Sequence, residues 1–176
     1  IADLGVTRTF QVMRPYARLR AYENLVVALS SPRARRLGGG GRGDRDVVAV
    51  DLLEELGFER DSRVPRQGAG TLPAGYLKRL ELGRCIALRP EVILCDEIFS
   101  GLALSEIASL VPLIERLRDR GIQIIMIEHR LRALFRVAGR VIALGRGRKI
   151  AEGDPRSVID HPAVREAYLG PEEEPA

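Results

Sequence analysis

Two acidic residues and one histidine stand where two buried strands are expected to end. Asp96 and Glu97 follow the apolar run Val92–Cys95. His129 comes shortly after a second expected strand, Ile122–Ile127, which contains the apolar run Ile124–Ile127. Continuous apolar runs are typical of parallel strands covered on both faces, and such sheets bind ligands outside the carboxyl ends of their strands. We therefore expect these three polar side chains to share one edge of a sheet.

These residue types suit phosphoryl chemistry. One carboxylate, Asp96, can hold Mg²⁺, which prefers oxygen ligands and keeps much of its water. The other, Glu97, can polarise a water for attack on a phosphoryl group. The imidazole of His129 can hydrogen-bond a γ-phosphate or the attacking water. Strand-end acids and single histidines are common, so the prediction of a phosphate site rests on their occurring together.

Gly75 opens a helix predicted to run from Gly75 to about Leu88. The first N–H groups of a helix are unpaired and carry partial positive charge, which favours phosphate. Glycine there would let a phosphate approach the backbone closely. An ordinary loop-to-helix glycine is the alternative. The polar positions of this helix include Lys78, Arg79, Glu81 and Arg84.

Strand–helix–strand order with apolar strands predicts an α/β fold with a parallel sheet covered by helices. Most of the stretch from Val12 to Leu88 reads as helix and loop, which suggests a helical subdomain inserted between strands. Before the first buried strand we expect a strand at Thr7–Val12, a helix at Tyr22–Leu29 and a loop at Ser31–Asp44. A further helix there would be capped by Asp44, carry Val48, Leu52 and Leu56 on one face and end at Gly57.

Between the two buried strands we expect a helix capped by Ser105 and ended by Gly121, whose apolar face holds Ile107, Leu110, Val111, Ile114 and Leu117. Pro112 predicts a kink in this helix or a displaced start. The rest of the chain is expected to form a short helix at Leu131–Val137, a hairpin of Val141–Leu144 with Lys149–Glu152, and short helices near Ser157 and at Val164–Leu169.

The composition excludes several classes of protein. With 45% hydrophobic and 30% charged residues and a net charge of +4, the 176-residue chain is neither disordered nor membrane-spanning. Its many arginines are interleaved with acids, and aromatic residues make up only 5%, so a nucleic-acid platform is not expected. Cys85 and Cys95 lie in apolar contexts without a CxxC spacing and read as buried thiols. The glycine run Gly38–Gly41 has no following lysine and is interpreted as a surface insertion rather than a P-loop.

The ordered motifs resemble the nucleotide-binding subunits of ATP-binding cassette (ABC) transporters, from the Q-loop onward. They are Gln11, the stretch Leu72–Tyr76, Val92–Glu97, Ser100–Leu102 and Glu128-His129. Four stretches resemble more closely the ATP-binding subunits of branched-chain amino acid importers: Arg8–Gln11, Ile127–His129, Gly147–Gly153 and Glu166–Gly170. The resemblance covers nearly the whole chain. It implies a P-loop NTPase-like core with an inserted helical subdomain, truncated at its N-terminus.

The resemblance also implies a role for each matching residue. Gln11 would be the Q-loop glutamine, which touches Mg²⁺ and the attacking water. Ala74 and Gly75 would belong to the signature that closes on ATP held by the opposite subunit. Asp96 would be the Walker B acid on Mg²⁺, Glu97 the catalytic carboxylate and His129 the switch histidine. The implied domains are 1–11 (end of the N-terminal core), 12–90 (helical subdomain), 91–170 (rest of the core) and 171–176 (tail).

From the same resemblance we expect ATP and Mg²⁺ as ligands and a second ATP-binding subunit and membrane permease subunits as partners. Nucleic acid is not expected as a partner. The location would be peripheral, on the cytoplasmic face of the membrane. Because the chain has no initiator Met and no Walker A motif, we expect it to be part of a longer chain and not to bind ATP tightly alone.

Some positions depart from the family pattern. Pro73 stands where the family usually has serine, and Tyr76 where it usually has a polar residue such as glutamine; Ile98 and Ala103 also differ. Two alternatives to an importer ATPase stay open. Pro73 and Tyr76 motivate a degenerate cassette that does not hydrolyse ATP and serves as a structural partner. The basic pI permits a soluble ABC ATPase of DNA repair or translation, although the importer-like stretch Gly147–Gly153 argues against it.

Overall fold

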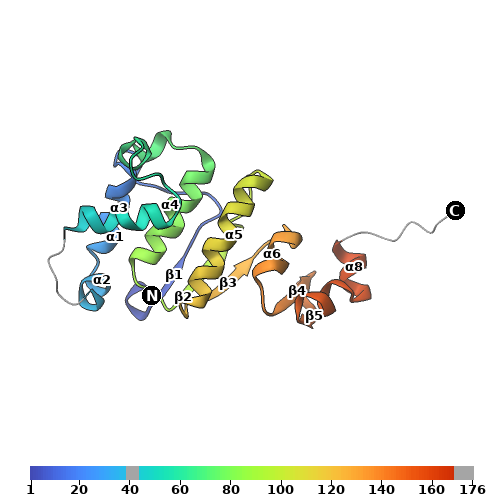
Figure 1. Ribbon diagram of the computed structural model, residues 1–176. Helices are drawn as coiled ribbons and strands as arrows, with labels where there is room; N and C mark the ends of the chain where they lie inside the picture. The colour runs from blue at the N-terminus through green and yellow to red at the C-terminus, as the bar shows by residue number, and fades with distance from the viewer. Residues whose placement is uncertain (39–43, 169–176) are drawn as a thin grey trace. The chain divides into compact units, whose positions relative to one another are not determined.

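The computed structural model describes residues 1–38 and 44–168 (Figure 1). The chain divides into two compact units, of which the first is Ile1–Arg130 and the second begins at Leu131. The predicted helical subdomain, residues 12–90, falls within the first unit. Most of the glycine run and the whole predicted tail at 171–176 lie outside the described residues.

A parallel sheet in the first unit holds the strands that carry the predicted chemistry. Its described strands are β1 (Val6–Arg8), β2 (Val92–Asp96) and β3 (Gln123–Ile127), in the order β1-β2-β3. Both pairings are parallel. All three strands therefore end at the same edge, and the central one delivers Asp96 and Glu97 to that edge.

The sheet is not buried on both faces along its whole width. Ile93 and Cys95 of β2 are buried, with 0% and 3% of their surface exposed. In β3, Ile125 and Ile127 are 58% and 66% exposed. The expectation that β3 is a doubly buried strand is therefore wrong, because no described element of this unit covers that face of β3.

Three helices pack against one another beside the sheet (Figure 1): α1 (Ala21–Leu29), α3 (Arg45–Glu55) and α4 (Ala74–Ala87). Their contact buries leucines, including Leu25 and Leu53, completely. Short 3-10 helices occupy Ala2–Leu4, Val64–Arg66 and Ala69–Thr71.

The predicted N-cap of α3 is confirmed, since Asp46 N–H donates to Asp44 Oδ1 at 2.9 Å. The predicted apolar face of this helix is confirmed in part. Leu56 is buried and Leu52 half-buried, but Val48 is 39% exposed. Ala49 and Leu53, which were not predicted, are buried instead.

Helix α5 (Leu104–Asp119) buries the five side chains predicted for its apolar face. Its start differs from the prediction, because Ala103 rather than Ser105 is the N-cap. Ala103 has no side-chain oxygen that could cap the helix. Its own backbone N–H is satisfied instead by the carboxylate of Glu106, which accepts it at 2.8 Å. The helix continues through Pro112, so Pro112 does not displace its start.

The predicted loop at Ser31–Asp44 contains a helix, α2 (Pro32–Leu37). The Ser31 hydroxyl accepts the Ala34 N–H, and Pro32 stands at the first helical turn, where its missing N–H has no consequence. These two features are a helix start rather than a loop signal, which is why the loop prediction fails here.

The second unit is a hairpin covered by short helices. It contains α6 (Leu131–Val137), β4 (Val141–Gly145), β5 (Arg148–Gly153), α7 (Pro155–Ile159) and α8 (Pro162–Tyr168). The two strands pair antiparallel, as predicted. Arg146 and Gly147 form the turn with φ of 49° and 76°, the left-handed values that tight hairpins need. Leu169, the predicted end of the last helix, lies outside the described residues.

The reactivity of the two buried cysteines provides a chemical test of how the core is packed. Cys85 and Cys95 are 5% and 3% exposed. Burial raises the pKa of Cys85 to about 11 and that of Cys95 to about 12. Since the thiolate is the reactive form, we expect a disulfide reagent to modify the folded protein at least roughly a hundredfold more slowly than the unfolded protein. Absorbance of the released thiol in buffer and in guanidinium measures both rates, and fast labelling of either cysteine in buffer would contradict this packing.

Candidate functional site

Three segments far apart in the sequence meet at the carboxyl edge of the sheet. Gln11 follows β1, Glu97 follows β2 directly and His129 follows β3. Gln11 Nε2 donates to Glu97 Oε2 at 2.8 Å. The same carboxylate oxygen lies 3.8 Å from His129 Nδ1. The proximity expected from parallel strand ends is therefore found, and Glu97 is the residue that the other two share.

The backbone of Glu97 is held in an unusual conformation. Its φ is 46°, in the left-handed region that residues with a side chain rarely adopt. Such a residue costs about 1–2 kcal/mol relative to a right-handed one. Hydrogen bonds hold it there: Glu97 N–H donates to Ile127 O at 2.9 Å, and Glu97 O accepts from Ser100 N–H at 3.0 Å. The turn after β2 thus fixes the direction of the carboxylate.

Asp96 lies beside this cluster on the same strand end. Arg8 Nη2 forms an ion pair with Asp96 Oδ2 at 2.7 Å, and Asp96 N–H donates to Thr9 Oγ1 at 3.2 Å. About a quarter of the Asp96 side-chain surface, 28%, remains exposed. A ligand can therefore still reach the carboxylate of Asp96.

The oxygen donors of this edge fit Mg²⁺. Asp96 supplies a carboxylate and Gln11 an amide oxygen, which are hard ligands. Among the described residues no group of three His, Cys, Asp or Glu side chains is arranged to hold a metal ion. That is compatible with Mg²⁺, which is commonly bound by one or two protein groups together with water and substrate phosphates.

Glu128 is a structural partner of the same edge. Its Oε1 accepts the Phe99 N–H at 2.7 Å, which ties the turn after β2 to the end of β3. Burial raises the pKa of Glu128, while the hydrogen bond from Phe99 and the neighbouring His129 act in the opposite direction. Sequence analysis placed Glu128 only as the neighbour of His129.

The stretch Leu72–Tyr76 forms the start of α4. Pro73 occupies the N-cap position and Ala74 is the first helical residue. Gly75 is buried, and a Cβ there would collide with the carboxylate of Glu106 on α5. The Tyr76 ring packs edge-on against Phe58, with 4.9 Å between ring centroids. The glycine thus allows close approach of Glu106, and its predicted approach to a phosphate stays a prediction.

Two buried charged side chains of α4 lie beside the site, and neither was predicted from the sequence to take part in it. Lys78 and Glu81 are buried, with 3% and 6% of their surface exposed. Lys78 Nζ donates to Glu97 O at 3.3 Å. No pattern in the sequence singles out Lys78, because burial on α4 is not confined to one narrow face and includes its neighbours Leu80 and Leu82.

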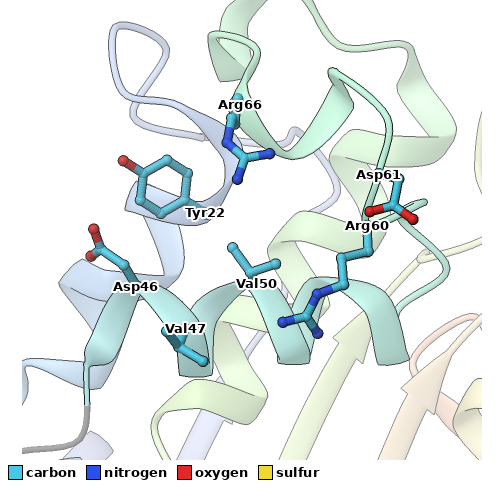
Figure 2. Close-up of a pocket in the computed structure, with 7 residues that line it drawn as sticks. All are labelled: Tyr22, Asp46, Val47, Val50, Arg60, Asp61 and Arg66. Carbon is cyan, nitrogen blue, oxygen red and sulfur yellow. The ribbon is translucent and has the colours of Figure 1, made fainter.

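A separate pocket lies among the helices of the first unit (Figure 2). It has a volume of about 400 Å³. Figure 2 shows it bordered by one residue of α1, three of α3 and three from the segment that follows α3: Tyr22, Asp46, Val47, Val50, Arg60, Asp61 and Arg66. None of the predicted site residues lines it, and the pocket carries no assignment.

None of the helices in the described part of the chain is both long and apolar enough to cross a membrane.

Comparisons with known proteins agree with the geometry. A family model described as "Branched-chain amino acid ATP-binding cassette transporter" matches residues 148–172. The high-affinity branched-chain amino acid transport ATP-binding protein BraF of Pseudomonas aeruginosa is 32% identical over 97% of this chain and 69% of its own length. The lipopolysaccharide export system ATP-binding protein LptB of Haemophilus influenzae is 30% identical over 96% of this chain and 67% of its own length.

The fold is also similar to that of solved cassettes. The ADP conformation of MJ1267, described as an ATP-binding cassette of an ABC transporter, superposes with a TM-score of 0.77 at 27% identity. That likeness covers 97% of this chain and 70% of the other.

Proposed function

This chain belongs to the ATP-binding subunits of ABC transporters, of the branched-chain amino acid type, and from that premise we propose that it hydrolyses ATP to power import of branched-chain or related amino acids. The observation that carries the proposal is the shared Glu97 carboxylate, bonded by Gln11 and adjacent to His129 at the end of the sheet. A carboxylate, an amide and an imidazole in that arrangement can hold and activate one water at a terminal phosphate.

In this proposal each side chain has a distinct task. Glu97 accepts a hydrogen bond from the attacking water and so directs a lone pair of the water oxygen toward phosphorus. Gln11 fixes the Glu97 carboxylate and offers its amide oxygen to the water or to Mg²⁺. The His129 imidazole hydrogen-bonds a γ-phosphate oxygen. Asp96 and Gln11 would hold Mg²⁺, which would neutralise negative charge on the phosphates.

The proposed site is completed by a second subunit. The start of α4, including Ala74 and Gly75, would close on ATP bound by the opposite ATP-binding subunit, so that hydrolysis takes place at a dimer interface. The partners would be that subunit, identical or related, and the permease subunits in the membrane. The protein would then lie at the cytoplasmic face, attached through the permease.

One observation favours a second candidate, a cassette that does not hydrolyse ATP and serves as a structural partner. Pro73 stands at the N-cap of α4 and makes no capping hydrogen bond there. A serine hydroxyl at this position would offer a donor to the γ-phosphate, and Pro73 removes it. Glu97, Gln11 and His129 are all present, which favours hydrolysis over the second candidate.

The test is a reconstituted transport assay with the full-length protein, its companion ATP-binding subunit and the permease subunits in lipid vesicles. We expect ATP hydrolysis and ATP-driven accumulation of labelled leucine, isoleucine or valine. Hydrolysis without movement of any amino acid would overturn the importer assignment and leave the ATPase intact. A complex that binds ATP without hydrolysing it would support the non-hydrolysing cassette instead.

A further inference from the structure

Three charged side chains of α4 bind the backbone of one short segment that contains Gln11. Phe10 N–H donates to Glu81 Oε1 at 2.8 Å. Lys78 Nζ donates to Gln11 O at 3.1 Å, and Arg84 Nη1 donates to Arg14 O at 2.7 Å. The donors and acceptors lie three residues apart along the helix and so share one face of it. The segment 10–14 is thereby fastened to α4 by side chains rather than by strand pairing.

Lys78 does more than hold this segment. Its ammonium group donates to Gln11 O at 3.1 Å and to Glu97 O at 3.3 Å, and so bridges the backbones of both residues. The side chains of the same two residues are joined by the 2.8 Å bond from Gln11 Nε2 to Glu97 Oε2. Lys78, Gln11 and Glu97 therefore form a closed ring of hydrogen bonds, with Lys78 on the inner side of the site.

A contribution to the stability of the fold is a poor explanation for a buried lysine at position 78. Lys78 is 3% exposed, and its bonded partners are carbonyl oxygens rather than a carboxylate. Glu81 lies near enough to influence it electrostatically, yet no ion pair joins the two among the described residues. Burying an ammonium in this way is unfavourable compared with a well-packed apolar side chain. The two carbonyls it bridges belong to the residues whose side chains meet at the site.

We propose that Lys78 is a positioning residue for ATP hydrolysis: it locks the Gln11 segment and the left-handed backbone of Glu97 to each other, so that the carboxylate faces the attacking water. This inference rests on the proposed ATPase function. Lys78 touches neither the water nor the phosphate in this proposal and acts only through Gln11 and Glu97. Loss of the bridge would leave Glu97 O with the Ser100 N–H, and the Gln11 carbonyl would lose its bond to α4 while Glu81 and Arg84 still hold the two ends of the segment.

The experiment compares Lys78→Met and Lys78→Arg in the full-length protein within its transporter complex. Methionine keeps the length and apolar stem without the donors, and arginine restores donors for both carbonyls. We expect Lys78→Met to lower kcat for ATP hydrolysis by about thirtyfold with KM changed less than about threefold, since small misplacements of a reacting group cost up to about a hundredfold. Lys78→Arg should recover most of the kcat.

The other lysine of the chain supplies the matched control. Lys149 lies on the hairpin and pairs with Glu152, so Lys149→Met should leave kcat unchanged. Hydrogen exchange gives a second readout: in Lys78→Met the amides of Glu97 and Ser100 should exchange faster at an unchanged melting temperature. If Lys78→Met lowers the melting temperature, reduces kcat only in proportion to the loss of folded protein and leaves the exchange of these two amides unchanged, Lys78 is a folding residue and the inference fails.

The inference and the function on which it depends fail differently. If the wild-type complex hydrolyses ATP and Lys78→Met retains full kcat, the positioning role is overturned and the ATPase assignment stands. If the wild-type complex does not hydrolyse ATP, the proposed function is overturned, and the positioning role with it. Should Lys78→Met fail to fold, Lys78→Gln, which retains one donor group, replaces it in the same comparison.

Discussion

Replacing Glu97 with glutamine in the full-length transporter is expected to lower ATP turnover by at least about a hundredfold, in the range that general-base groups contribute. The substitution is nearly isosteric and keeps the left-handed backbone and an oxygen near Gln11. It removes the negative charge that draws a proton from the water. The proposed partner of Glu97 is the attacking water rather than ATP itself, so the affinity for ATP should change little.

A phosphate-release assay on the reconstituted complex measures the loss, and equilibrium ATP binding measures the affinity. Glu59→Gln, at an exposed position of the same unit, is the control and should retain full turnover. An unchanged rate in Glu97→Gln would remove Glu97 from the catalytic role, and with it the proposed use of Gln11 and His129.

The second large effect is expected at Gly83, in the contact of α4 with α1 and α3. A Cβ at this position would lie 2.5 Å from Leu56 Cδ1 and 3.2 Å from Leu25 Cδ2. Both leucines are fully buried and cannot move without displacing their neighbours. Gly83→Leu should therefore lower the free energy of unfolding by about 3 kcal/mol, since overpacking exceeds the gain of about 1 kcal/mol in helix propensity.

Urea unfolding followed by circular dichroism gives this value. Gly139→Leu is the matched control, because a Cβ at Gly139 would have none of the described atoms within 4 Å. It should change the free energy of unfolding by less than about 0.5 kcal/mol. Equal losses in the two variants would mean that α4 does not approach α1 as closely as described.

The meeting of Glu97 with His129 was predictable because it follows from general geometry. Two apolar runs that become neighbouring parallel strands must end at one edge, and polar residues directly after them must lie near each other. Gln11 joined this prediction only through the family resemblance. The expected strand at Thr7–Val12 is shorter in the structure, ending at Arg8, which leaves Gln11 in the segment that α4 holds.

The contribution of Lys78 was not predictable in the same way. Charged residues on a helix are usually solvated, and their burial is decided by which segment covers them. Here the covering segment, residues 10–14, is distant in sequence and carries little regular structure. For the same reason the burial of β3 was predicted wrongly. An apolar run predicts a strand, but whether both of its faces are covered depends on other elements of the fold.

The left-handed backbone at Glu97 has a consequence for engineering. Glycine adopts that conformation without strain, so selection of variants for heat resistance alone would favour glycine at position 97. The variant that survives heating best would then be one that has lost its carboxylate. A library of variants designed for higher thermal stability therefore has to be screened for ATP turnover as well as for resistance to heat.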